Sequence, residues 1–247
     1  AVAIQLQAIY MGFSTAISGV FLPKVTAMVT KENNEKAISD LFIRTGRIQY
    51  IIIAFILTGF VVFGKSFIRL WAGSDYEDAY GITLCFFIPM TVPLIQNLGI
   101  IILQARNQMK FRSTLYVVIA FVSLVISIPL SKQYGGIGCA ISIALALTTG
   151  QIIVMNIYYH RVIHIDILDF WKEIGKMSLV PFAIGSLSFY LFCIYEIHTV
   201  QIFIVCIFAF SCIYVPLFWF FGMNAYEKEL FVSPVRRFVG RLQKNLQ

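Results

Sequence analysis

The sequence predicts an all-α, polytopic membrane protein, a bundle of helices that crosses a bilayer several times. Composition is the first reason: hydrophobic residues make up 59% of the 247 residues and charged residues only 13%, whereas soluble domains carry about 45–50% and about 25%. The second reason is that long windows without a charged residue follow one another along the chain. A transmembrane β-barrel would instead show alternating segments of roughly 10 residues, so the spanning elements are predicted to be helices.

Seven apolar windows are each long enough to cross, because a span needs about 20 residues. The second window crosses only if it extends past Lys65, whose ammonium group would then reach the interface. The predicted helices lie near residues 3–27, 48–71, 80–105, 114–131, 137–159, 178–195 and 200–221. The chain is therefore divided into a transmembrane bundle over 1–222 and a basic, amphipathic tail over 223–247.

Lys and Arg are distributed unevenly between the two sides of the predicted bundle. The segments 24–47, 106–112, 161–176 and 228–244 hold sixteen of the nineteen. The positive-inside rule places these segments, and with them the C-terminus, in the cytoplasm. The net charge of +7 is then a topology signal and an attraction to anionic lipids, so no nucleic-acid partner is expected.

Three charged segments have apolar residues at helical spacing: 31–47, 162–174 and the tail. In the tail the apolar positions are Phe231, Val235, Phe238 and Leu242. All three segments are interpreted as amphipathic helices that lie on the inner leaflet. Capture of a substrate or of a lipid diphosphate is the alternative.

Two features predict departures from straight, evenly packed helices. Pro89 and Pro93 stand in the middle of the third predicted span, and each removes a backbone donor and crowds the carbonyl four residues earlier. This helix should bend or open there, either as a packing kink or to line a cavity, as kinked helices do in transporters. Gly135 and Gly138, at the start of the fifth span, should allow close helix packing.

Uncharged polar residues recur in the first, third and fifth predicted spans. Amides at such depth should face protein or water rather than lipid. Two roles stay open, namely hydrogen bonding between helices and the lining of a hydrophilic path. The residues are Gln5, Gln7, Tyr10, Ser14, Thr15, Gln96, Asn97, Gln104, Asn107, Thr148, Thr149, Gln151 and Asn156.

The sequence offers no catalytic or metal-binding chemistry. No carboxylate lies deep in a predicted span, so a proton relay has no candidate. His160 and His164 have the spacing of a metal pair, with Asp166 and Asp169 nearby, but a third organised ligand is missing. Hydrolase, protease and nucleotide-binding motifs are absent. The five cysteines all lie within predicted spans and are interpreted as buried free thiols. We expect no enzyme activity, metal or cofactor.

Several short strings resemble bacterial polysaccharide flippases of the multidrug/oligosaccharidyl-lipid/polysaccharide exporter superfamily. One string runs over 67–79 (FIRLWAGSDYEDA), a second over 102–110 (ILQARNQMK) and a third over 134–141 (YGGIGCAI). The opening 18–23 (SGVFLP), followed by a charged loop that ends at 44–47 (RTGR), is similar to the same proteins. The order of these strings and their loop sides together carry the resemblance, which covers about residues 14–160.

The resemblance implies a fold and a function. Such flippases have two pseudo-symmetric bundles around a central cavity that opens alternately to each side of the bacterial cytoplasmic membrane. They move an undecaprenyl-diphosphate-linked oligosaccharide from the inner to the outer leaflet for cell-surface polysaccharides, in several cases driven by an ion gradient. This chain would be the C-terminal lobe and its N-terminal lobe would be missing, in keeping with a first residue that is not Met and lies within an apolar segment.

The same resemblance suggests which residues would contact the cargo. Arginine attracts a diphosphate, and amides bond to sugar hydroxyls that would otherwise cost several kcal/mol each in hydrocarbon. The alternative role for each arginine near the inner opening is that of a positive-inside anchor. The candidate substrate-binding residues are Arg44, Arg47, Arg106, Gln96, Asn97 and Gln104.

Three other functions compete with this one. A drug or cation exporter of the same superfamily shares the fold, but it would be expected to use a buried acid or an aromatic cavity. A seven-helix receptor fits the topology, yet the last span has no lysine for a retinal Schiff base. A membrane-embedded enzyme would be expected to have a large outer loop or buried His and Asp, and the longest outer loop is only about residues 72–79.

Overall fold

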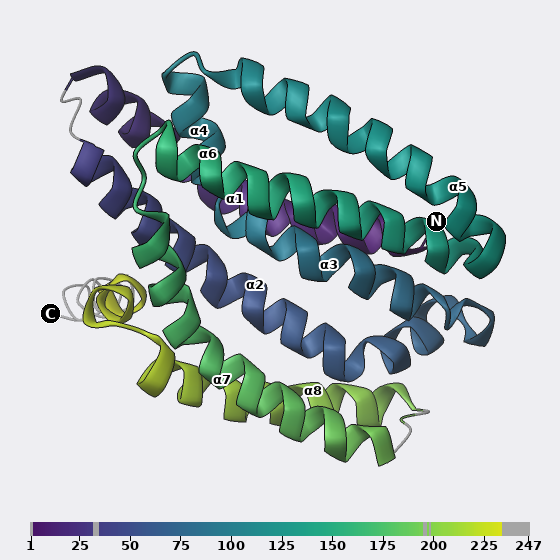
Figure 1. Ribbon diagram of the computed structural model, residues 1–247. Helices are drawn as coiled ribbons and strands as arrows, with labels where there is room; N and C mark the ends of the chain where they lie inside the picture. Colours follow the sequence, from purple (N-terminus) through teal and green to yellow (C-terminus); the bar gives the residue numbers. More distant parts are fainter. Residues whose placement is uncertain (1, 32–34, 195–196, 198, 234–247) are drawn as a thin grey trace, which may run out of the picture.

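The computed structural model describes residues 2–31, 35–194, 197 and 199–233, and the regular elements in these ranges are all helical. The predicted all-α class is therefore confirmed (Figure 1). The elements are α1 (Val2–Lys31), α2 (Glu35–Ala72), the 3₁₀-helix η1 (Ser74–Tyr76), α3 (Ala79–Ile95), α4 (Leu98–Ala105), α5 (Met109–Leu147), the π-helix η2 (Thr148–Val154), α6 (Met155–Arg161), α7 (Ile167–Ile194), α8 (Val200–Leu217) and the π-helix η3 (Phe218–Gly222). A further helix covers 225–233.

Four helical segments of the described chain are long and apolar enough to cross a membrane: 35–72, 109–161, 167–192 and 200–222. The pair α3 and α4, bent by 48° at a short break, would be a fifth. A multi-pass membrane bundle is thus supported. The structure gives four or five candidate spans, however, and not the seven that the sequence predicted.

The difference in number has two sources. Helix α1 carries amides and hydroxyls along its length and is not among the four segments. The predicted fourth and fifth helices form one helical segment of 53 residues, 109–161. At Gly135 its backbone is non-helical (φ 59°, ψ −136°), and there the chain turns back on itself, as Figure 1 shows in teal. A Cβ atom on Gly138 would collide with the carbonyl oxygen of Leu130, so the turn is tight.

Two predicted interface segments are instead the first turns of long helices. Helix α2 begins at Glu35 rather than near 48, and α7 begins at Ile167 rather than near 178. The physical reason is packing within the protein, because Phe42 and Phe170 are fully buried with ring centroids 5.1 Å apart. The apolar face predicted for the lipid surface therefore contacts protein. Of the predicted tail, Phe231 lies in the helix 225–233, whereas Val235, Phe238 and Leu242 lie outside the described residues.

Helix α2 is the centre of the bundle and packs against α1, α3, α7 and α8. Aromatic side chains fill its contact with α8, where Phe63 meets Phe210 at a ring-centroid distance of 5.5 Å. Helix α5 lies at the edge of the bundle (Figure 1), and its apolar side chains, such as Val117 and Phe121, are about 70% exposed. Such exposure suits contact with lipid.

Candidate functional site

The break between α3 and α4 interrupts one of the candidate spans. Helix α3 contains Pro89 and Pro93 and ends at Ile95, and α4 starts at Leu98. Across the break the N–H of Gly99 donates to the carbonyl oxygen of Gln96 (2.8 Å) instead of to Ile95, four residues earlier. The carbonyl of Ile95 therefore loses its helical donor and needs another partner.

Side chains from α1 and α2 supply the missing donors. The Ser14 hydroxyl donates to the carbonyl oxygen of Leu94 (2.7 Å). Gln49 donates from its amide nitrogen to the carbonyls of Leu94 (3.0 Å) and Ile95 (2.9 Å), and its amide oxygen accepts from the Ser18 hydroxyl (2.5 Å). Neighbouring helices thus satisfy the broken backbone, as is required for non-helical structure at membrane depth.

The polar contacts extend to α6 and α7. Asn97 donates to the Ser14 hydroxyl oxygen (3.3 Å), and Gln96 donates to the side-chain oxygen of Asn156 (2.8 Å). Asn156 also accepts from the indole N–H of Trp171 (3.2 Å). We call this group the break cluster: Ser14, Ser18, Gln49, Gln96, Asn97 and Asn156. Its members come from three separate helical elements, α1, α2 and α6, and from the break itself, and none of them is charged.

Two glycines let the helices approach the break closely. A Cβ atom on Gly99 would lie 2.5 Å from the hydroxyl oxygen of Tyr159. A Cβ atom on Gly46 would lie 2.9 Å from the carbonyl oxygen of Ile95 and 2.5 Å from Phe170. Any larger residue at either position would push α2, α6 or α7 away from the break.

The polar face of α1 continues beyond the break cluster. Tyr10 and Thr91 share a hydrogen bond of 2.8 Å, and the amide of Gln7 donates to the sulfur of Met90 (3.4 Å). Gln5 and Thr15 lie on the opposite, exposed face. Of the polar residues predicted in the first span, Gln7, Tyr10 and Ser14 therefore bond between helices.

Arg47 lies in a second, charged network at one end of the bundle. Its Nε donates to Glu227 Oε1 (2.6 Å), its Nη2 to Glu227 Oε2 (3.0 Å), and its Nη1 to Glu173 Oε2 (2.6 Å). Arg47 is only 5% exposed and Glu227 only 1%. Arg47 is therefore neutralised within the protein and joins α2, α7 and the helix 225–233.

The other predicted cargo contacts lie apart. Arg44 is exposed, with its guanidinium 5.4 Å from the centre of the Tyr226 ring. Arg106 donates to the carbonyl oxygen of Ile163 (3.1 Å), and Gln104 is exposed on α4. Only Gln96 and Asn97 of the six predicted residues belong to the break cluster. Pro89 and Pro93 precede the break, and Gly135 and Gly138 form the turn within α5.

Sequence reasoning missed Gln49, Glu173 and Glu227. Gln49 stands alone among apolar residues at the start of the second span, and an isolated amide there is the signal that it bonds to another helix. Glu227 follows Asn224 by three residues, and the two form a reciprocal capping pair, with hydrogen bonds of 2.9 Å in both directions. That spacing could have been recognised as a helix start.

The histidine pair does not gather a metal site in the part of the chain that the structure describes. Within residues 2–31, 35–194, 197 and 199–233 no group of three or more His, Cys, Asp or Glu residues is placed to hold a metal ion. His160 and His164 are both exposed.

No family model matches this chain, and neither a curated protein nor a solved structure matches it. The resemblance to polysaccharide flippases therefore stays a prediction that rests on the short sequence strings. The geometry of the break cluster stands independently of it. A neutral, hydrogen-bonded cluster at a broken helix can exchange its partners with a polar solute without moving a charge out of water.

Proposed function

We propose that this chain is one lobe of a membrane flippase that moves an undecaprenyl-diphosphate-linked oligosaccharide from the inner to the outer leaflet. One observation carries the transport part of this proposal. A candidate span is broken at a cluster of uncharged polar residues, and transporters place their binding sites at such discontinuous helices near the membrane centre. The nature of the cargo rests on the sequence resemblance.

The break cluster suits a glycan headgroup. Each unpaired sugar hydroxyl costs several kcal/mol in hydrocarbon, so the headgroup needs partners along its whole path. Gln96, Asn97 and Asn156 carry both donors and acceptors, which is what a sugar hydroxyl requires. In the proposed cycle these amides exchange their bonds to each other for bonds to the cargo as the lobe opens.

The paired state of Arg47 changes which cations are proposed for the diphosphate. Arg44 and Arg106 are the better candidates, because neither forms an ion pair with a carboxylate among the described residues. Arg47 is assigned instead to holding α2 against α7 and the helix 225–233.

The proposal includes features of topology and assembly. Counting α1, α2, the α3–α4 pair, the two arms of α5 with α6, α7 and α8 gives seven crossings, with the C-terminus in the bacterial cytoplasm. A second, N-terminal lobe completes the cavity, and an ion gradient is the proposed driving force. A tag placed after Gln247 tests the second lobe, because the native membrane protein should then have roughly twice the mass of this chain.

The function is tested with the native protein in liposomes that contain a fluorescent undecaprenyl-diphosphate oligosaccharide. We expect movement between leaflets, and we expect Gln96→Leu to slow it about tenfold, because the side-chain oxygen of Asn156 would lose the hydrogen bond that Gln96 donates. Gln104→Leu is the matched control, since Gln104 is an exposed amide two turns further along.

Three results would contradict the proposal. Wild-type protein that leaves the oligosaccharide in its original leaflet is not a flippase. Equal rates for Gln96→Leu and Gln104→Leu would remove the break cluster from the path. Transport of small organic cations in place of the lipid-linked glycan would favour the drug exporter, the closest alternative.

A further inference from the structure

Arg112, near the start of α5, is a buried cation that has no counter-charge in the described chain. It is only 8% exposed. Among the residues that the structure describes, no carboxylate forms an ion pair with it. Arg47 is the contrast, because it is equally buried and two carboxylates hold it. An arginine is almost never buried unless it is paired, since a charge is costly to remove from water.

The polar neighbours of Arg112 are tyrosine hydroxyls. Its Nη2 donates to the hydroxyl of Tyr116 (2.8 Å), and its Cζ atom lies 5.1 Å from the centre of the Tyr116 ring. The guanidinium also interacts with the hydroxyl of Tyr159. Both hydroxyls are neutral, and a guanidinium carries five N–H donors. The described chain therefore gives this cation hydrogen-bond acceptors but no negative charge.

Arg112 does not have the placement of a positive-inside anchor. An anchoring side chain extends into the headgroup region and stays exposed, as Lys110 does two residues earlier. Arg112 instead lies beside Tyr159, whose hydroxyl would be 2.5 Å from a Cβ atom on Gly99 in the first turn of α4. The buried charge is thus one side chain away from the break between α3 and α4.

Tyr116 covers the guanidinium on the accessible side. It is 41% exposed and lies on α5, at the edge of the bundle (Figure 1). The start of α5 is held against α6 by the stacked rings of Phe111 and Tyr158, whose centroids are 4.0 Å apart. Tyr116 can therefore turn away without separating the two helices. An acceptor that arrives from the bilayer would then replace the Tyr116 hydroxyl.

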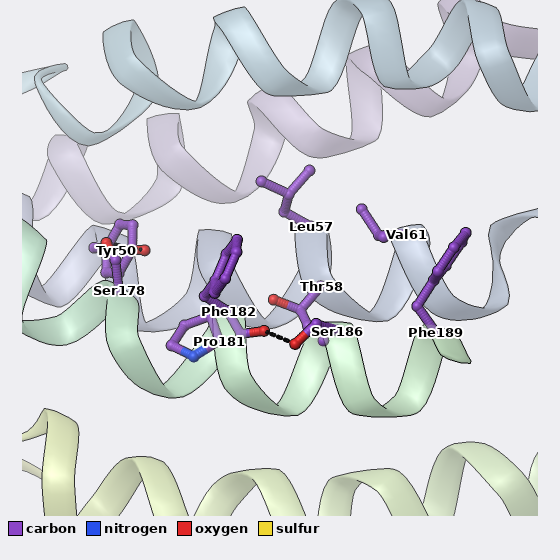
Figure 2. A pocket seen from close by; sticks show the side chains of 10 residues that line it. Tyr50, Leu57, Thr58, Val61, Ser178, Pro181, Phe182, Ser186 and Phe189 are labelled. Carbon is purple, nitrogen blue, oxygen red and sulfur yellow. Dashed lines mark hydrogen bonds between the residues drawn. The ribbon is translucent and has the colours of Figure 1, made fainter. Parts of the chain in front are cut away.

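The groove between α2 and α7 does not suit an anion. It has a volume of about 400 Å³, and none of the ten residues that line it is charged (Figure 2). Its hydroxyls already bond within the protein: Thr58 donates to the carbonyl of Ala54 (2.7 Å) and Ser186 to that of Phe182 (2.8 Å). An anionic group would find no counter-charge in this groove, whereas Arg112 offers one.

We propose that Arg112 binds a phosphate group carried by a lipid of the inner leaflet. A phosphate supplies the negative charge and accepts two parallel hydrogen bonds from a guanidinium. The diphosphate of the cargo and the headgroup of a phospholipid offer the same chemistry. Arg106, already proposed for the diphosphate, precedes Arg112 by six residues at the end of α4. The inference rests on the proposed function only where the phosphate is that of the cargo.

Native mass spectrometry of the detergent-extracted native protein tests this site. The protein is titrated with two matched pairs of lipids, undecaprenyl diphosphate against undecaprenol and phosphatidylglycerol against the diacylglycerol with the same acyl chains. We expect the phosphate to increase affinity about tenfold in at least one pair, the lower end for hydrogen bonds to a charged group. Arg112→Met should remove this increase. Arg112→Lys keeps the charge without the planar fork and should reduce it.

Two comparisons control for charge and for stability. Lys132→Met removes an exposed cation from the same helix, about 30 Å further along, and should leave the phosphate preference unchanged. Without added lipid, Arg112→Met should need as much sodium dodecyl sulfate for unfolding as the wild type, because it removes a charge that has no partner. Arg47→Met breaks a buried ion pair and should unfold at a lower concentration.

The two lipid pairs distinguish the source of the phosphate. Diphosphate binding that depends on Arg112 supports the site and assigns it to the cargo, whereas dependence of phosphatidylglycerol alone supports the site and removes the cargo from it. Equal phosphate preferences for Arg112→Met and Lys132→Met would overturn the inference. So would an Arg112→Met variant that is as unstable as Arg47→Met or does not fold, because Arg112 would then have a counter-charge within the protein. A flippase whose transport rate ignores Arg112 would keep the proposed function and lose this inference.

Discussion

Replacing Arg47 with methionine separates the two roles that this residue could have. Methionine keeps much of the length of the side chain and removes its charge and its donors. In the structure Arg47 holds both oxygens of Glu227, at 2.6 and 3.0 Å, and one oxygen of Glu173, at 2.6 Å. If these contacts are its purpose, Arg47→Met should act first on stability. If Arg47 binds a diphosphate, it should act first on transport.

The expected loss of stability comes mainly from Glu227. That side chain is 1% exposed and would stay buried without a counter-charge, which costs about 3–5 kcal/mol when one partner of a buried pair is removed. Glu173 is 32% exposed and also pairs with Lys176 (2.6 Å), so it can be hydrated and adds little. We therefore expect Arg47→Met to lower the free energy of unfolding by about 3–5 kcal/mol.

Unfolding in mixed micelles by increasing sodium dodecyl sulfate measures this free energy. The double variant Arg47→Met, Glu227→Leu removes both charges and should recover about 2–3 kcal/mol relative to the sum of the single variants. We also expect the double variant to keep its transport activity, because the carboxylate that remains in the network, Glu173, still pairs with Lys176.

The reasoning fails if Arg47→Met costs less than about 1 kcal/mol, the size of an exposed pair. It also fails if the losses of the two single variants simply add. A folded double variant that has lost transport would restore Arg47 as a cargo contact, as the sequence first suggested.

Two further predictions follow from the packing around the break and from the loop after α2. Gly46→Ala should lower the free energy of unfolding by about 1–3 kcal/mol, since the new methyl group would lie 2.9 Å from the carbonyl oxygen of Ile95. Gly12→Ala is the control, because Gly12 faces open space and the change should cost nothing. Equal melting temperatures for the two variants would contradict the packing argument. Glu77 has a lowered pKa because Arg69 donates to it, so its contribution to stability is present above the ordinary value of 4.5 and is lost as the pH falls through the lower pKa of the folded protein. The difference in melting temperature between wild type and Glu77→Gln should therefore be constant from about pH 6 to 8 and shrink below 4.5, and a difference that grows in acid would refute the ion pair.

The fold class was predictable because the high apolar and low charged content of the chain suits a lipid bilayer and not water. The number of spans was not, because a hydropathy window cannot tell how helices join. The turn at Gly135 depends on a positive φ and on the close approach of Gly138 to Leu130, and neither changes the hydropathy. In the same way, α2 extends back to Glu35 because Phe42 packs on Phe170, a contact between residues far apart in sequence.

The candidate site was predictable only in part. Pro93 marked the region of the break, and Gln96 and Asn97 follow it directly in the sequence. Gln49 was missed because an amide in an apolar run looks the same whether it faces lipid or the carbonyls of Leu94 and Ile95. Arg47 was interpreted as a cytoplasmic anchor or cargo contact because its partners, Glu173 and Glu227, are brought to it only by the fold.

The two polar networks differ in how easily they can be opened, and this difference indicates which parts of the lobe move. Hydrogen bonds between helices within a membrane contribute about 0.6 kcal/mol each, because a broken bond soon finds another partner. Freeing α1 from α3–α4 at the break breaks the bonds of Ser14 to Leu94 and to Asn97, so it costs about 1 kcal/mol in hydrogen bonds. Separating α2 from the helix 225–233 leaves the buried Glu227 without Arg47, at about 3–5 kcal/mol. We therefore expect α2, α7 and the helix 225–233 to move as one body while the break between α3 and α4 rearranges, because opening the bundle there costs the least.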